Sequence, residues 1–152
     1  MNWRQTCYLL AMASNPPTPD EVVSTMFSRD AASAGLGMEV VEARPGYAKV
    51  TMPVTAKHVN GLDVCHGGFI FSLADSAMAF ASNADNQQSV AVHADIYWHA
   101  PGRLHTTLTA EAHRRQQQGR NSLHDVRVTD NEGVLVASFR GQTRDVGGAY
   151  LP

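Results

Sequence analysis

The sequence predicts an α+β fold in which an antiparallel sheet curls around one long central helix, preceded by an N-terminal helix. The segment from His66 to Asn83 contains one Asp and no Lys, Arg or Glu, where about four charged residues would be usual. Its apolar residues recur at three- and four-residue spacing and also occupy its other sides, which predicts a buried helix. Alternating apolar segments joined by short turns lie on both sides of it, and such strands form antiparallel sheets.

The other elements follow from local patterns in chain order. Thr18 or Asp20 caps a helix predicted over 19–34, which Gly35 and Gly37 end. Strands are predicted over 38–43, 47–54, 89–99, 104–113, 122–128 and 134–144. A polar loop over 55–65 leads into the central helix, and turns are expected at 44–46, 116–119 and 129–133. The chain of 152 residues then forms one domain over 18–146, with a flexible extension over 1–17 and a flexible tail over 147–152.

The central helix carries two features that favour an acyl-transfer or hydrolysis site. Asp75 is its one ionisable side chain, and a buried carboxylate is costly unless something pairs with it or uses it. Gly67 and Gly68 open the helix, which suggests a close approach to the backbone. The free N–H groups of a first helical turn favour a carbonyl oxygen that gathers negative charge.

The spacing of these two features predicts a homodimer. Eight residues at about 1.5 Å rise place Asp75 about 12 Å along the helix axis from Gly67. One substrate carbonyl therefore cannot touch both groups of one copy. If both act on one bond, they come from two copies of the chain, which share their sites.

Composition excludes several other classes of function. A net charge of −2 and a pI of about 6.4 do not indicate the basic character that is typical of nucleic-acid-binding proteins. No apolar run is long enough to span a bilayer, and Cys7 and Cys65 do not make a disulfide framework. The apolar segment over 7–13 behind Arg4 weakly resembles a signal peptide, but it is short and has one basic residue. We therefore expect a cytoplasmic protein.

Residues 60–83 resemble the hot-dog fold thioesterases, most of all the type that acts in phenylacetic acid degradation (PaaI). The matching motifs are Asn60-Gly61, Cys65-His66-Gly67-Gly68, the run from Phe71 to Ala77, Phe80-Ala81 and Asn83. The resemblance implies a helix wrapped in a sheet, dimers in which two sheets join, and in many members a homotetramer. It also implies hydrolysis of an acyl-coenzyme A, here an aryl-acetyl or hydroxylated phenylacetyl thioester, without a cofactor.

The resemblance assigns roles residue by residue. Asp75 acts as nucleophile or general base on the thioester, and the backbone N–H of Gly67 polarises its carbonyl from the facing subunit. Asn60 positions the attacking water or the carboxylate, and His66 shapes the loop. Gly68, as one of the two glycines that open the helix, is expected to contact substrate. Members often have His-Gly where Leu62-Asp63 stand here, and residues 91–101, with His93, Trp98 and His99, are also less typical. The resemblance therefore leaves the preferred acyl group open.

Simpler structural explanations compete with several of these roles. Asp75 also fits a solvent-facing stripe with neighbouring serines, and His66 fits a helix cap. A thiol at a helix N-terminus, as at Cys65, can be a nucleophile, but no general base is evident, so a small buried side chain is favoured. Arg114 and Arg115, with Arg120, would suit the phosphates of coenzyme A, although such runs more often line a solvated sheet edge. The seven histidines show no zinc spacing, so no metal is expected.

Two other functions fit the same fold. One is a non-catalytic protein that binds acyl-coenzyme A without turnover. The other is a hot-dog dehydratase, which needs a His-Phe-Pro motif before the helix. Here Gly67-Gly68 follow His66, so the dehydratase ranks last.

Overall fold

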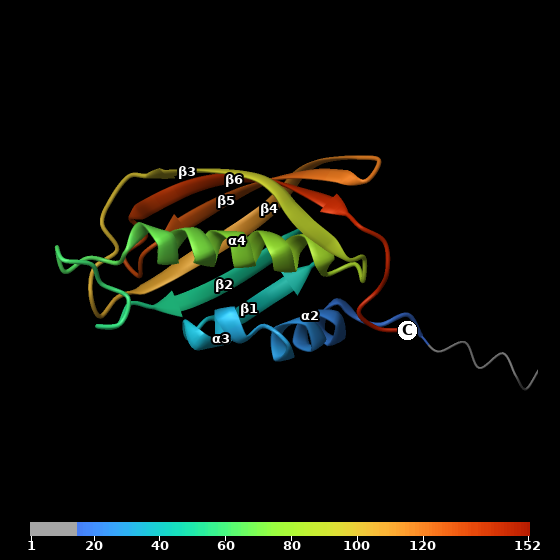
Figure 1. The fold of residues 1–152 in the computed structure, drawn as a ribbon, viewed down its shortest axis with the longest axis horizontal. Helices are drawn as coiled ribbons and strands as arrows, with labels where there is room; N and C mark the ends of the chain where they lie inside the picture. Colours follow the sequence, from blue (N-terminus) through green and yellow to red (C-terminus); the bar gives the residue numbers. More distant parts are fainter. Residues whose placement is uncertain (1–14) are drawn as a thin grey trace, which may run out of the picture.

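The computed structural model describes residues 15–152, which form one antiparallel sheet with a long helix against it (Figure 1). The expectations for residues 1–14, including Cys7 and the weak signal-peptide pattern, lie outside the described residues. The helices are α2 (Pro19–Ser28), α3 (Ala31–Gly35) and α4 (Gly67–Asn83). The strands are β1 (Glu39–Arg44), β2 (Tyr47–Pro53), β3 (Ser89–Trp98), β4 (Thr107–Gln118), β5 (Asn121–Thr129) and β6 (Leu135–Asp145).

The strand order makes α4 a crossover that spans the whole sheet. The six strands lie in the order β1-β2-β4-β5-β6-β3, and every neighbouring pair is antiparallel. The chain leaves β2 near one edge, runs along α4 and enters β3 at the opposite edge (Figure 1). This confirms the predicted class of an antiparallel sheet around one central helix, and it leaves β1 and β3 as the two edges.

The hydrophobic core lies between α4 and the inner face of the sheet. Alternate residues of β2, β4 and β5 are buried against the helix, as expected for strands with one face on a core. The helix contributes its sheet-facing side: Ile70, Leu73, Ala74, Ala77, Met78, Phe80 and Ala81. These side chains fix the position of α4, and with it the position of every functional group that the helix carries.

The helix predicted over 19–34 is two helices, and the single-helix prediction was wrong. The carboxylate of Asp30 accepts a hydrogen bond from the backbone N–H of Ser33 at 2.9 Å, so it caps a new helix instead of continuing the first. The hydroxyl of Ser33 bonds that of Ser76 in α4 at 2.9 Å. The break therefore docks α3 onto the central helix. The N-terminal cap of α2 is Thr18, whose side chain forms a capping box with Glu21.

Strand β4 begins later and ends later than predicted. A turn at 103–106, in which His105 has a φ of +67°, delays its start to Thr107. The residues expected to turn the chain, 116–119, instead mostly continue the ladder, because Gln116 and Gln118 pair with Leu123 and Asn121 beyond a bulge. The turn follows at Gly119, whose φ is +58°.

The C-terminal residues bond the loop between α4 and β3. The side-chain amide of Asn86 bonds Tyr150 and Leu151, and Gln88 bonds Gly148 and Ala149. The flexibility of residues 147–152 stays a prediction beside these contacts.

A buried histidine lies on the inner face of β5. His124 of β5 is fully buried, and neither ring nitrogen has a hydrogen-bond partner within residues 15–152. Burial, with a smaller contribution from Arg114, lowers the pKa of His124 from 6.5 to about 4, while Asp125 opposes the shift. The ring is therefore neutral at physiological pH.

We predict that this histidine makes the fold sensitive to acid. Because its pKa is depressed in the folded state, the unfolded chain takes up the proton first as pH falls from 6.5 to about 4. Up to about 3 kcal/mol of stability should be lost over that range. Urea unfolding at a series of pH values should show this loss in the native chain and a flatter profile in His124→Leu. An equal loss of unfolding free energy with falling pH in the two chains would contradict this role of His124.

Candidate active site

The N-terminus of α4 leaves one backbone N–H group free. His66 is the N-cap residue, and its Nδ1 atom accepts a hydrogen bond from the N–H of Gly68 at 3.0 Å. The carbonyl of His66 accepts from Phe69 at 2.9 Å and from Ile70 at 3.4 Å. The N–H of Gly67 has no acceptor within residues 15–152. This first turn therefore presents a single unoccupied donor at the positive end of the helix dipole.

Position 67 leaves little room for a side chain, because the indole ring of Trp98 lies against it. A Cβ atom on residue 67 would stand 3.2 Å from Nε1 and Cε2 of Trp98, closer than nearly all such contacts. Trp98 is the last residue of β3, so the topology brings the end of that edge strand to the start of α4. A small residue at position 67 is needed for this close approach.

The loop before α4 holds Asn60 and His66 together through backbone bonds. Asn60 and Val64 are joined by an N–H to carbonyl bond of 2.9 Å, and His66 donates to the carbonyl of His58 at 2.8 Å. The side-chain oxygen of Asn60 accepts from Leu62 at 2.9 Å, while its amide Nδ2 has no acceptor in the described part of the chain. Asp63 has a φ of +57°, a conformation that glycine adopts most easily.

Asp75 lies on the side of α4 that faces the β3 edge. It follows Phe71 and precedes Met78 on one stripe of the helix; the ring of Phe71 packs edge-on against Phe139 of β6. In the described chain the carboxylate of Asp75 takes part in no hydrogen bond and no ion pair, and its side chain is half-buried. Burial raises the pKa of Asp75. The carboxylate is thus partly desolvated and has no bonding partner in the described residues.

The two groups do not meet within one protomer. They lie eight residues apart on one straight helix, about 12 Å along its axis. The structure brings Gly67, Gly68, His66 and Asn60 together at one end of α4 and leaves Asp75 in its middle.

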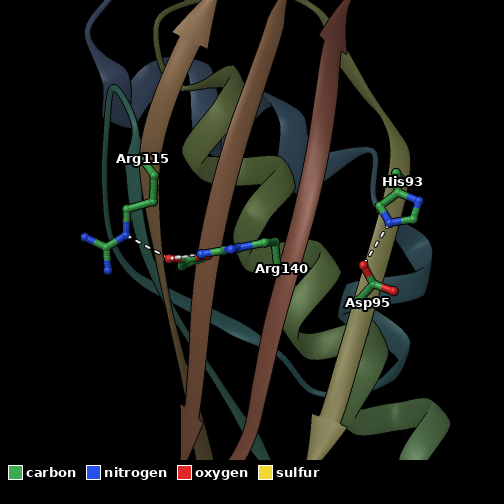
Figure 2. Close-up of polar contacts among 5 residues, drawn as sticks. His93, Asp95, Arg115 and Arg140 are labelled. Carbon is green, nitrogen blue, oxygen red and sulfur yellow. Dashed lines mark hydrogen bonds and ion pairs between the residues drawn. The ribbon is translucent and has the colours of Figure 1, made fainter.

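The two arginines that follow one another in β4 point to opposite faces of the sheet. Arg114 lies on the inner face beyond the C-terminal end of α4, where it bonds Asp85 at 3.5 Å. Arg115 lies on the outer face and bonds Asp125 at 3.1 Å, and Arg140 bonds the same carboxylate at 2.6 Å. Figure 2 shows Arg115 and Arg140 reaching one carboxylate from either side, with α4 behind the sheet. Since α4 is about 25 Å long, Arg114 is far from Gly67 of its own protomer.

The cysteine beside the site is poorly suited to attack a substrate. Cys65 is free and buried, and burial raises the pKa of its thiol to about 11. A thiolate is the nucleophilic form, so this environment favours the small buried side chain expected for Cys65. Within residues 15–152 no group of three or more His, Cys, Asp or Glu side chains is placed to hold a metal ion.

A hollow beside Gly67 did not follow from the sequence. It has a volume of about 320 Å³, and its lining includes Gly67, Ile70 and Trp98. The contact of Trp98 with Gly67 depends on the order of the strands, which the sequence does not give. The only sequence signal for the hollow was that residues 91–101 are atypical of the family. We call it the Trp98 hollow.

Comparisons with known proteins agree with this fold. Residues 62–137, half of the chain, match the family model of the thioesterase superfamily. The acyl-coenzyme A thioesterase PaaI of Escherichia coli is 39% identical over 123 residues, which cover 81% of this chain and 88% of that protein. The solved structure of E. coli PaaI aligns with a TM-score of 0.85 at 36% identity, covering 90% of this chain and 99% of that chain.

Two further relatives widen the comparison. A putative esterase of Archaeoglobus fulgidus is 30% identical over 147 residues, covering 97% of this chain and 96% of that protein. The smu.793 protein of Streptococcus mutans, solved bound to acetyl CoA, aligns with a TM-score of 0.71 at 25% identity, covering 74% of this chain and 90% of that chain. The chain therefore belongs to the thioesterase superfamily and has its hot-dog fold.

Proposed function

We propose that the chain hydrolyses acyl-coenzyme A thioesters at sites that two copies of it share. The observation that carries the proposal is that α4 holds a free N–H at Gly67 and an unpaired, partly buried carboxylate at Asp75 that faces the sheet edge. Membership of the thioesterase superfamily makes the chain a thioester hydrolase. The similarity to E. coli PaaI and to a protein bound to acetyl CoA supports coenzyme A as the thiol part of the substrate.

The proposed mechanism uses each group for one task. The thioester carbonyl accepts a hydrogen bond from the N–H of Gly67, which with the helix dipole stabilises the oxyanion that forms. Asp75 of the other protomer removes a proton from water as the water oxygen bonds to the carbonyl carbon. Collapse breaks the carbon–sulfur bond, and the coenzyme A thiolate takes up that proton. Direct attack by the carboxylate, followed by hydrolysis of the anhydride, gives the same products.

The β3 edge supports pairing between two copies. Four of the exposed large apolar side chains lie in this one strand: Val90, Val92, Tyr97 and Trp98. An edge strand that exposes apolar residues and unpaired backbone groups is a template for another strand. An antiparallel pair of β3 strands around a twofold axis would continue the sheet from one protomer into the next.

The same arrangement would complete the site. The helix α4 runs antiparallel to β3, since Trp98 lies beside Gly67 at one end and Asn83 bonds Ser89 at the other. A twofold axis that pairs the two β3 strands antiparallel therefore also makes the two α4 helices antiparallel. An axis that passes beside Phe71, about midway between Gly67 and Asp75, places each carboxylate level with the other protomer's Gly67. That geometry matches the 12 Å separation which one protomer cannot bridge.

The neighbouring residues take supporting roles in this proposal. Asn60 has a free side-chain N–H group with which to hold the water or the carboxylate, and His66 fixes the first turn by capping it. The N–H of Gly68 is bonded to His66, so Gly68 would contact substrate through van der Waals packing against its backbone and not through a hydrogen bond from its N–H. Arg114 and Arg115, for which the sequence left a phosphate role open beside a solvated sheet edge, are engaged with Asp85 and Asp125. A phosphate role for Arg114 would be at the site of another protomer, because Arg114 is far from Gly67 of its own.

The finer points of the proposal come from the family resemblance. We propose an aryl-acetyl or hydroxylated phenylacetyl group as the acyl part, a dimer or tetramer as the assembly, no cofactor, and a cytoplasmic location. No helix in the described residues is long and apolar enough to cross a membrane.

The first test is loss of the carboxylate. Asp75→Asn keeps the shape of the side chain but cannot accept the proton, so turnover of acyl-coenzyme A should fall about 10²- to 10⁴-fold. Release of the coenzyme A thiol over a panel of acyl-coenzyme A compounds measures it, with Asp20→Asn on α2 as the control. Turnover in Asp75→Asn equal to the native rate would refute the mechanism. A native chain that binds these compounds without releasing thiol would instead favour the non-catalytic alternative.

The second test removes the backbone N–H of Gly67 by a substitution that the first position of a helix accepts. Gly67 is the first helical residue, and His66 before it has a ψ of 132°, so Gly67→Pro fits the helix backbone. It eliminates the N–H and, as any side chain would, adds a Cβ against Trp98. We expect a loss of about 10²- to 10³-fold in kcat. Gly67→Ala keeps the N–H and reports the effect of a Cβ against Trp98. Equal losses in both variants would mean that crowding, rather than the donor, is responsible.

The third test asks whether sites are shared. Asp75→Asn and Gly67→Pro chains are each expected to be inactive, but a dimer of one with the other has one site with both groups intact. Random mixing should restore about a quarter of the native activity. Co-expression with two affinity tags isolates the mixed dimer for assay. Mixed dimers that stay as inactive as either variant would show that each site belongs to one protomer.

A further inference from the structure

Trp98 presents a large apolar ring beside Gly67, whose N–H is proposed above to hold the thioester carbonyl. Its side chain is 53% exposed, and it lies on the helix side of β3 with Ile96, which packs against the core. Its ring atoms stand 3.2–3.3 Å from the position of a Cβ on Gly67. A carbonyl oxygen held by the Gly67 N–H is therefore next to the indole.

The Trp98 hollow is lined mainly by apolar groups. Its walls include Val64, Ile70 and Pro101, and its lining contains no Asp, Glu, Lys or Arg. His99 borders it, but its Nε2 atom pairs with the hydroxyl of Ser138 in β6 at 2.9 Å. A volume of about 320 Å³ has room for a small acyl group. The chemistry of the lining thus fits an apolar group better than a charged one.

The inference rests on the function proposed above. We propose that Trp98 determines the acyl specificity of the enzyme, because its indole ring packs against the acyl group of the thioester whose carbonyl Gly67 holds. Aromatic rings pack best against other flat rings in offset or edge-on contact. The ring therefore favours flat, unsaturated acyl groups over puckered or branched groups of the same size.

The adjacent Tyr97 provides a matched comparison on the same strand. Tyr97 is 69% exposed and points to the outer face, where it borders a separate hollow with Arg115 and Arg140. Figure 2 shows these two arginines on the face opposite α4. A change at Tyr97 perturbs the β3 edge as a change at Trp98 does, but it does not alter the Trp98 hollow.

The experiment compares three thioesters: acetyl-, phenylacetyl- and cyclohexylacetyl-coenzyme A. The last two share a skeleton and differ in whether the ring is flat. In Trp98→Leu we expect kcat/KM for the phenylacetyl compound to fall about tenfold and that for acetyl-coenzyme A by less than about twofold. The native preference for phenylacetyl over cyclohexylacetyl should disappear. Trp98→Phe should keep most of that preference, and Tyr97→Leu should keep all of it.

The outcomes separate this inference from the proposed function. Hydrolysis of acetyl-coenzyme A by the native chain supports the function whatever the variants do. An equal loss on all three thioesters in Trp98→Leu would overturn the inference, because the hollow would then hold the pantetheine arm common to them. A native chain that does not distinguish the flat from the puckered ring would overturn it as well.

Discussion

The spacing of two groups on one rigid helix governs the rest of this structure. The amide hydrogen of Gly67 and the carboxylate of Asp75 are fixed by the burial of α4 against the sheet, and neither can move toward the other. Any reaction that uses both needs a second helix in the opposite direction. The sheet provides the means, because its strand order leaves β3 unpaired on the side of α4 that carries Asp75.

The start of α4 shows how a helix can keep one donor free. Three donors near its start are occupied: His66 accepts from Gly68 through its ring and from Phe69 and Ile70 through its carbonyl. The cap therefore does more than stabilise the helix, since it removes competing donors and leaves the Gly67 N–H as the one directed outward. The buried ring of His124 differs from this cap, because neither of its nitrogens has a hydrogen-bond partner within residues 15–152.

The local elements could largely be predicted from the sequence, and the long-range contacts could not. The apolar run of α4 and the isolated Asp75 gave the helix within one residue and its orientation to the core. The break between α2 and α3 was missed because the carboxylate of Asp30 competes with helix continuation, which periodicity does not reveal. Strand alternation places Arg114 and Arg115 on opposite faces of the sheet beside a bulge, which their adjacency in sequence does not reveal. The contact between Trp98 and Gly67 needs the strand order, which no local pattern contains.

That contact also constrains how the protein can change by substitution. An indole at position 98 and any side chain at position 67 compete for the same space, so the effect of a substitution at one position depends on the residue at the other. A smaller residue at 98 has to come first for a side chain at 67 to be accommodated without displacing the ring. The order of substitutions therefore matters, and the residue at position 98 would change before a side chain could be accommodated at position 67.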